Sequence, residues 1–260
     1  MFLAGTVLQF WQAYLREVGP VSVHPRDKFD PSLIRLNSLE KLVSFTDSLA
    51  AIKEVDPEGF PEEYAELADS VVRSRFYYGL QNYRFSENYL ANLAGKYIWS
   101  HFKAKVKPDH ILRGQKAFCS QSSIVFQALL LNKGIDVRTV LFHDHFCTEV
   151  LINGHWSFHD VSYKPNLNEI PRLSTEQLIA NPHYLQTAYL YSFREDFARN
   201  LEFHFDPEKI SYGKVNAFPA PSMILFHQFT WFFSWFGWAV FLGLALVSWW
   251  VAKKSGNKAN

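Results

Sequence analysis

The chain has 260 residues, with 26 Lys and Arg against 25 Asp and Glu, a formal net charge of +1 and two cysteines. A balanced charge gives no electrostatic basis for binding nucleic acid. Two cysteines are too few for a disulfide-stabilised secreted scaffold. No phosphate-binding glycine loop or internal repeat is present. These features exclude a nucleic-acid partner and indicate a globular domain, and no cofactor is expected.

Residues 1–110 predict a helical N-terminal layer. Residues 1–18 carry apolar residues at helical spacing but neither the basic segment nor the cleavage site of a signal peptide, which favours an amphipathic helix. Further helices are expected at 32–55, from Pro61 onward and at 86–105. This part of the chain identifies no chemistry.

Residues 111–217 have a different character and predict one helix followed by three strands, at 119–133, 135–142, 145–152 and 155–161. Gly134 follows the helix, as is typical of a helix C-terminus. Asn153 and Gly154 form the strongest short signal for a two-residue hairpin turn. The order helix, strand, strand, turn, strand predicts an α+β domain with an antiparallel sheet.

The hairpin turn fixes which residues share a face of the sheet. If Asn153 and Gly154 are its two residues, Ile152 faces His155 and the pairing places Cys147 opposite Asp160. His145 is then the diagonal neighbour of Asp160, at about 7 Å between backbones, so that the two side chains can meet. The opposite face carries His155 and His159.

Cys119 adds a third group because it opens the helix. The positive end of a helix and a nearby imidazolium both favour the nucleophilic thiolate. A carboxylate bound to the imidazole would hold the tautomer that accepts the thiol proton. The pattern predicts a catalytic triad of Cys119, His145 and Asp160.

The stretch from Cys119 to Asp160 resembles the core of the transglutaminase-like superfamily, a branch of the papain-like cysteine enzymes. The resemblance is carried by nine positions, which are Cys119, Gly134, Ile135, Arg138, His145, Glu149, Val150, Trp156 and Asp160. It implies a papain-like fold in which Cys119 is the nucleophile, His145 the general base and acid, and Asp160 the orienting carboxylate.

The chain also departs from the family pattern. Cys147 stands where the family often has an aromatic residue, and Ala117 where it often has glycine. The second donor of an oxyanion hole is not legible, although Gln115 and Gln121 are near enough in sequence to serve. An ordinary polar role is the commoner one for both glutamines.

The resemblance implies acyl transfer through a Cys119 thioester, with a protein or peptide as substrate. Water as the acceptor gives a cysteine protease or amidase, which is a hydrolase, and an amine gives a transglutaminase, an acyltransferase. One alternative is an inactive scaffolding or binding module. A second is a zinc hydrolase that uses His143, His145 and Cys147, which alternate along one strand face.

The C-terminal part predicts a single-pass membrane anchor. Residues 228–252 hold no charged residue or histidine and reach about 36 Å as a helix, against a hydrocarbon core of about 30 Å. A basic tail, 253–260, follows. Its lysines favour a cytoplasmic tail, whereas the absence of a signal peptide favours a cytoplasmic domain, and we expect the soluble domain to face the cytoplasm.

Two further expectations concern residues around the triad. Glu149 is expected to form a buried ion pair or hydrogen bond, with Arg138 as the nearest partner. The segment 166–216 is expected to surround the site, with His183, Tyr184 and the aromatic residues of 189–205 as substrate walls or as core.

Overall fold

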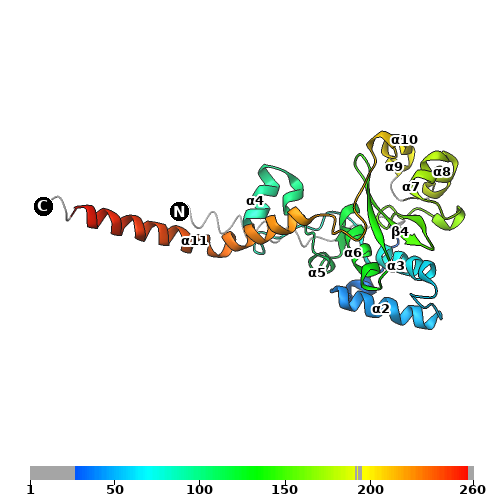
Figure 1. Cartoon of the computed structure of the whole chain (residues 1–260), viewed down its shortest axis with the longest axis horizontal. Coiled ribbons are helices and arrows are strands. Elements are labelled where there is room, and N and C mark those ends of the chain that lie inside the picture. The colour runs from blue at the N-terminus through cyan, green and yellow to red at the C-terminus, as the bar shows by residue number, and fades with distance from the viewer. Residues whose placement is uncertain (1–26, 191, 193–194, 257–260) are drawn as a thin grey trace. The chain divides into compact units, whose positions relative to one another are not determined.

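The computed structural model describes residues 27–190, 192 and 195–256, and these residues form an α+β protein (Figure 1). They fall into two compact units. The larger unit holds the residues up to Gln81 together with Lys105–Ala220, and the smaller holds Asn82–Ala104 together with the C-terminal helix. The units therefore combine segments that a division at residue 110 separates. The amphipathic helix predicted for residues 1–18 lies outside the described residues.

The larger unit begins with helices. The first three span Pro31–Arg35 (η2, a 3-10 helix), Leu39–Ile52 (α2) and Pro61–Arg75 (α3). The helix predicted at 32–55 is therefore wrong in its start, because Ser38 is the N-cap and its hydroxyl accepts a hydrogen bond from the Lys41 amide at 3.3 Å. The start of the next helix at Pro61 is confirmed, with two glutamates in its first turn.

A four-stranded antiparallel sheet forms the centre of this unit. Its strands are β3 (Val137–Leu141), β4 (Phe146–Ile152), β5 (His155–His159) and β6 (Ser211–Tyr212), in the spatial order β5-β4-β3-β6. The hairpin between β4 and β5 turns at Asn153 and Gly154, whose φ angles of 50° and 79° suit the predicted turn. Ile152 pairs with His155 and Thr148 with His159. The predicted register is confirmed.

Helix α6 (Cys119–Asn132) packs on one face of the sheet. The buried Gln127 amide donates hydrogen bonds to Thr139 of β3 and Thr148 of β4, at 3.2 and 2.9 Å. Gly134 lies beyond the helix end with a φ of +72°, a conformation that favours glycine. The predicted helix and its stop signal are confirmed.

Short helices and a core of aromatic residues cover the other face. The remaining elements of this unit are β1 (Tyr77–Tyr78), α5 (Pro108–Leu112), β2 (Lys116–Ala117), η4 (Leu167–Glu169), α7 (Thr175–Ala180), α8 (Pro182–Tyr189), α9 (Glu195–Arg199), α10 (Leu201–His204) and η5 (Pro207–Lys209). Figure 1 shows α7 to α10 gathered at one side of the sheet. Their core contains Tyr189, Phe197 and Phe205, which are at most 3% exposed. Strands β1 and β2 pair in parallel, and β2 is followed directly by α6.

The smaller unit contains α4 (Tyr89–Tyr97), η3 (Ser100–Lys103) and α11 (Pro221–Gly256). The helix predicted at 86–105 is therefore too long. It begins after Asn88, whose side chain accepts a hydrogen bond from the Ala91 amide at 3.1 Å, and a separate 3-10 turn follows its end. The Asn88 amide also donates to Thr230 of α11 at 2.9 Å, so the two helices share a buried polar contact.

Helix α11 differs from the single membrane-spanning helix predicted at 228–252. Among the described residues no one helix combines the length and hydropathy needed to cross a bilayer, and α11 meets that criterion only as two parts, Pro221–Gly237 and Ala239–Trp250, bent by 56°. Glycine at the end of the first part is a common cause of such a bend. The apolar run thus lies in a longer, bent helix whose first part packs against α4.

Candidate active site

Cys119 is the first residue of α6, as predicted, and it is 4% exposed. The Ser122 hydroxyl, one turn later, donates to the carbonyl oxygens of Phe118 and Cys119 at 3.1 and 3.2 Å. The thiol therefore sits at the positive end of a 14-residue helix whose first turn is held in place. This position favours negative charge on the sulfur.

Gln121 holds the loops that lead into this helix. Its amide oxygen accepts from the backbone N–H of Gln81 at 2.8 Å and of Phe118 at 3.2 Å, and its amide nitrogen donates to the carbonyls of Gln81 and Lys105, both at 2.7 Å. Both amide hydrogens are thereby engaged with backbone. Gln121 is thus a structural residue, whereas Gln115, the other candidate for the oxyanion hole, is exposed.

Replacing Gln121 by Ala is expected to lower the free energy of unfolding by about 3 kcal/mol, since each buried group left without its partner costs about 1–3 kcal/mol. Chemical denaturation of the full chain measures this change. The matched control is Gln115→Ala, which is expected to shift stability by less than about 0.5 kcal/mol. Equal effects of the two substitutions would contradict the structural role of Gln121.

His145 and Asp160 meet as predicted. The ring nitrogen Nε2 of His145 lies 2.7 Å from Oδ2 of Asp160, and both side chains are fully buried. His145 precedes β4 and closes a tight turn in which its carbonyl accepts from the Phe142 amide at 2.9 Å. Asp160 directly follows β5, at the position that continues the pairing with Cys147. The hairpin register brings the two residues together.

Asp160 is anchored by three further donors. Its Oδ1 accepts from the backbone N–H groups of Ser162 and Tyr163 at 3.0 Å each, and its Oδ2 accepts from the Tyr189 hydroxyl of α8 at 2.6 Å. Burial alone would raise the pKa of Asp160, but the charge of His145 and these hydrogen bonds outweigh it and lower the pKa to about 2. The carboxylate is ionised and fixed in direction.

Tyr189 is a positioning residue that the sequence pattern did not single out, beyond its place in the aromatic segment 189–205. Tyr189→Phe is expected to destabilise the protein by about 1.5–3 kcal/mol, the range for a hydrogen bond to a charged group. It is also expected to raise the pKa of Asp160, which a titration of the carboxyl signal by NMR detects. Tyr184→Phe, on the same helix but half-buried, is the matched control and should leave both quantities unchanged.

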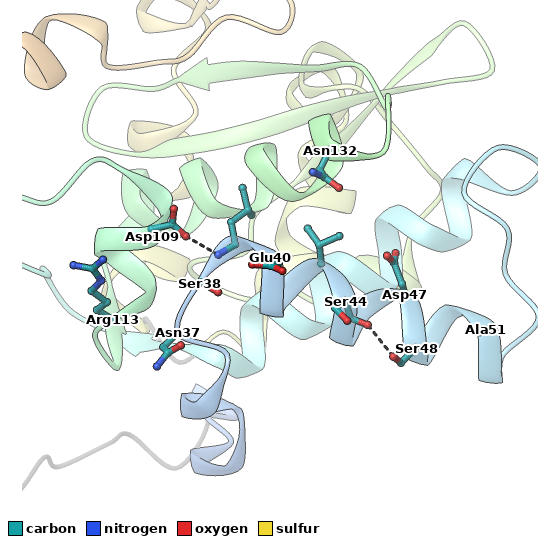
Figure 2. Close-up of a pocket in the computed structure, with 12 residues that line it drawn as sticks. Asn37, Ser38, Glu40, Ser44, Asp47, Ser48, Ala51, Asp109, Arg113 and Asn132 are labelled. Carbon is teal, nitrogen blue, oxygen red and sulfur yellow. Dashed lines mark hydrogen bonds between the residues drawn. The ribbon is translucent and has the colours of Figure 1, made fainter.

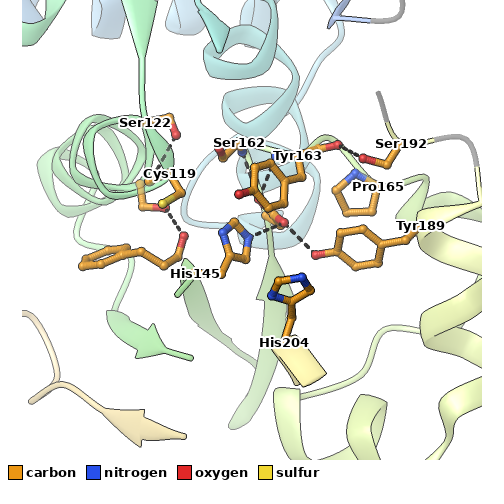
Figure 3. Close-up of polar contacts among 12 residues, drawn as sticks. Cys119, Ser122, His145, Ser162, Tyr163, Pro165, Tyr189, Ser192 and His204 are labelled. Carbon is orange, nitrogen blue, oxygen red and sulfur yellow. Dashed lines mark hydrogen bonds and ion pairs between the residues drawn. The ribbon is translucent and has the colours of Figure 1, made fainter. Parts of the chain in front are cut away.

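The imidazole of His145 is held between aromatic rings. The Tyr163 ring stacks on it with centroids 4.1 Å apart and planes at 3°, and Phe197 contacts it edge-on at 5.0 Å. Nδ1 of His145 is buried and makes no hydrogen bond. Figure 3 shows the Cys119 side chain at the start of α6, beside the imidazole and on the side away from Asp160. The nitrogen that Asp160 leaves unused is the one available to the thiol.

The surroundings of His145 favour its charged form. Burial would lower its pKa, but the charge of Asp160, the neighbouring sulfur of Cys147 and the hydrogen bond to Asp160 raise the pKa well above the usual value. A protonated imidazole beside a thiol stabilises the thiolate by direct attraction. The electrostatics therefore suit a thiolate and imidazolium pair.

Cys147 lies in the same group of side chains. It is fully buried, and burial raises the pKa of its thiol, followed in size by the charge of Asp160. Its sulfur and one ligand atom each of His145 and Asp160 all lie within 4.8 Å of one another. His143, the third ligand of the predicted zinc site, is exposed and packs instead against the ring of Phe203.

Three positions of the family resemblance have a structural role. Arg138 binds Oε2 of the buried Glu149 through Nε and Nη2, at 2.7 Å each, which confirms the expected ion pair. The other carboxylate oxygen of Glu149 accepts from the Thr175 amide at 2.7 Å. The Arg138 guanidinium also lies 4.3 Å from the ring centroids of Trp156 and Tyr212. These residues tie the four strands of the sheet and α7 together.

Two other histidines and the aromatic residues of segment 189–205 lie outside the triad. His159 points to the opposite face, as predicted, where its Nδ1 lies 3.0 Å from Asp69 of α3. The expected substrate walls are not the role of Tyr189 and Phe197, which belong to the core. His183 is exposed on α8. The sequence signal of an aromatic-rich segment thus marked packing around His145.

A cavity of about 880 Å³ lies along α2, apart from the candidate triad. Figure 2 shows its mostly polar lining, which includes Ser38, Glu40, Asp47 and Asp109. Several of these groups already bond within the protein: Asp109 accepts from the Leu39 amide at 2.8 Å, and Asp47 pairs with Lys133 at 2.6 Å. The size of this cavity therefore gives no reason to move the candidate site away from Cys119.

Comparison of the sequence with protein-family models and with curated proteins, and of the fold with solved structures, found no match.

Proposed function

We propose that the chain is a transglutaminase-like cysteine enzyme that transfers an acyl group through a thioester on Cys119. One observation carries the proposal: His145 gives Nε2 to Asp160 at 2.7 Å and leaves buried Nδ1 without a partner, beside a thiol at a helix start. A papain-like core is part of the proposal. It is supported by the packing of α6 on an antiparallel sheet that supplies the other two residues.

The reaction follows from these positions. Nδ1 of His145 takes the proton of Cys119, and the thiolate attacks the carbonyl carbon of an amide. The imidazolium returns the proton to the leaving nitrogen as the C–N bond breaks, which leaves the thioester. Water or an amine then attacks the thioester, gives its proton to His145 and releases Cys119. Asp160 keeps the imidazole in the required tautomer and offsets its positive charge throughout.

The acyl acceptor separates a transglutaminase from a hydrolase. We expect the full chain, incubated with a glutamine-containing peptide library, to release ammonia and to yield peptides whose masses show either glutamate or an added primary amine. Cys119→Ala is the matched control because it removes the nucleophile and adds no bulk. Product formation that persists in this variant would contradict the proposal.

A second reading is an inactive transglutaminase-like module that binds a partner at the membrane. The enclosure of the site favours it, because Cys119 is 4% exposed and His145 3% exposed. A substrate reaches such a thiol only after side chains around it move. The two readings differ in the chemistry of the sulfur: an acyl-enzyme trapped with an activated ester and located on Cys119 by mass spectrometry supports the enzyme, and its absence under all acyl donors supports the module.

We also propose that α11 tethers the chain to a membrane, with the larger unit facing the cytoplasm. The part Ala239–Trp250 exposes large apolar side chains, which include Phe241 at 70% and Trp249 at 62%. This part alone reaches about 18 Å, so crossing a core of about 30 Å requires both parts of the bent helix. Lipid is the environment that stabilises such a surface.

The tether is tested by extraction of cell membranes at alkaline pH. The wild-type chain should stay with the membrane, whereas Leu244→Arg should release a large fraction, since arginine at a helix centre costs about 2.5–3.5 kcal/mol on insertion. Protease protection in sealed vesicles then reports the orientation. A wild-type chain found entirely in the soluble fraction would contradict the tether and leave the chemistry of Cys119 untouched.

A further inference from the structure

Cys147 is the buried group of the candidate site that the acyl-transfer chemistry does not use. Cys147, His145 and Asp160 are all buried, and one ligand atom of each residue lies within 4.8 Å of the other two. Thiolate, imidazole and carboxylate are the three ligand types that zinc takes from proteins. The group also combines a soft donor with harder ones. Cys147 lies in β4, His145 directly precedes β4 and Asp160 directly follows β5, and the pairing of the two strands fixes their spacing.

The separations are near those of a zinc site. Bonds of about 2.3 Å to sulfur and about 2.0–2.2 Å to nitrogen and oxygen place tetrahedral ligand atoms roughly 3.3–3.8 Å apart. Nε2 of His145 and Oδ2 of Asp160, now 2.7 Å apart, would open by about half an ångström. The sulfur of Cys147, within 4.8 Å of the other ligand atoms, would approach them by about 1.0–1.5 Å at most. Side-chain rotations of this size leave the strands in place.

The charges also balance. The Asp160 carboxylate and a Cys147 thiolate carry two negative charges, which neutralise a divalent cation, while His145 binds as the neutral imidazole. A buried ion without net charge avoids most of the desolvation cost of a buried charge.

We propose that His145, Cys147 and Asp160 bind one zinc ion, and that bound zinc switches off the Cys119 thiol. Zinc binds the sulfur of Cys147, Oδ2 of Asp160 and Nε2 of His145, and the protons of the Cys147 thiol and of Nε2 pass to solvent. The ring proton then resides on Nδ1, which donates and no longer accepts. His145 can then neither accept the Cys119 proton nor carry the positive charge that favours the thiolate, although the ion does not bind Cys119. The binding stands without the proposed function, and only the switch-off depends on it.

The experiment uses cobalt as the probe for the full-length protein in detergent, because cobalt bound to a thiolate gives a sulfur-to-metal absorption band in the near ultraviolet. The wild type and Cys119→Ala should both give the band at one cobalt per chain, and zinc should displace it. Cys147→Ala should lose the band. Asp69→Asn, which alters the other buried histidine pair, is a control that should keep it.

The switch-off is measured in the same preparations by alkylation of Cys119. Saturating zinc should slow alkylation by at least roughly tenfold in the wild type and leave the rate in Cys147→Ala unchanged, since the loss of a metal-site partner weakens binding by about 10–100-fold or more. A band that depends on Cys119, or that survives in Cys147→Ala, would overturn the proposed ligands. A normal band in a protein whose Cys119 never reacts keeps the zinc site and rejects the acyl-transfer function.

Discussion

Replacement of His145 by Ala is expected to slow alkylation of Cys119 by roughly 100-fold or more near pH 6. Without the charged imidazole, the attraction that stabilises the thiolate is lost, and the unreactive thiol form dominates at that pH. The wild type keeps the charged imidazole that attracts the thiolate, because the pKa of His145 is raised well above its usual value. Stopped-flow alkylation followed by peptide mass spectrometry measures the rate at Cys119.

His159→Ala is the matched control for this experiment. His159 is also a buried histidine bound to an aspartate, Asp69, at 3.0 Å, but it lies on the opposite face of the sheet. Its loss is expected to lower stability and to leave the alkylation rate of Cys119 within about twofold of the wild type. If the two histidine variants slow alkylation equally, the effect comes from altered packing, and the role of His145 as base is wrong.

Asp160→Asn is the second change with a large expected effect, because neither orientation of the amide suits the site. With its oxygen toward His145 and Tyr189, the amide nitrogen faces the N–H groups of Ser162 and Tyr163, which are donors themselves. With the nitrogen toward His145, the ring is forced to carry its proton on Nδ1, toward Cys119. Loss of the correct tautomer costs up to about 10⁴-fold in serine proteases with a similar triad.

We therefore expect Asp160→Asn to slow acyl transfer by a factor of roughly 10³–10⁴ while the protein stays folded. Circular dichroism checks the fold, and product formation from the glutamine peptides measures the rate. Asp69→Asn provides the comparison, since it changes the aspartate of the other buried pair. Retention of more than about a tenth of the wild-type rate in Asp160→Asn would show that the carboxylate does not set the tautomer.

The part of the site that comes from local structure could be predicted from the sequence. A two-residue turn at Asn153 and Gly154 determines the pairing of two strands, and the pairing places His145 beside Asp160. The start of α6 at Cys119 is likewise a local property, ended by Gly134. These contacts join residues close in sequence, so period-two alternation and turn chemistry are sufficient to predict them.

The groups that hold the site from outside the hairpin could not be predicted in the same way. Tyr189 reaches Asp160 from a separate helix, and Gln121 bonds to Gln81 and Lys105, because the tertiary fold brings distant segments together. Nothing in the spacing of these residues indicates the contact. The same holds for Arg138, whose place between two aromatic rings depends on the order of the strands.

The ends of several helices were predicted less accurately than their presence, because local signals compete there. The helix expected at 86–105 begins only after its N-cap, Asn88. It ends at Tyr97, and a separate 3-10 turn follows. In the C-terminal part, hydropathy alone predicted a single membrane-spanning helix at 228–252. Polar residues within that stretch, Thr230 among them, bond to α4 instead, and the helix bends after Gly237.

The pH dependence of alkylation at each cysteine of the wild-type chain tests whether His145 and Asp160 activate Cys119. We expect Cys119 alone to react, at a rate that is already level at about pH 6, because the charged imidazole of His145 attracts the thiolate. Cys147 should stay unmodified, because burial raises the pKa of its thiol. A rate at Cys119 that rises only near pH 8.5, or modification of Cys147 alone, would contradict the claim.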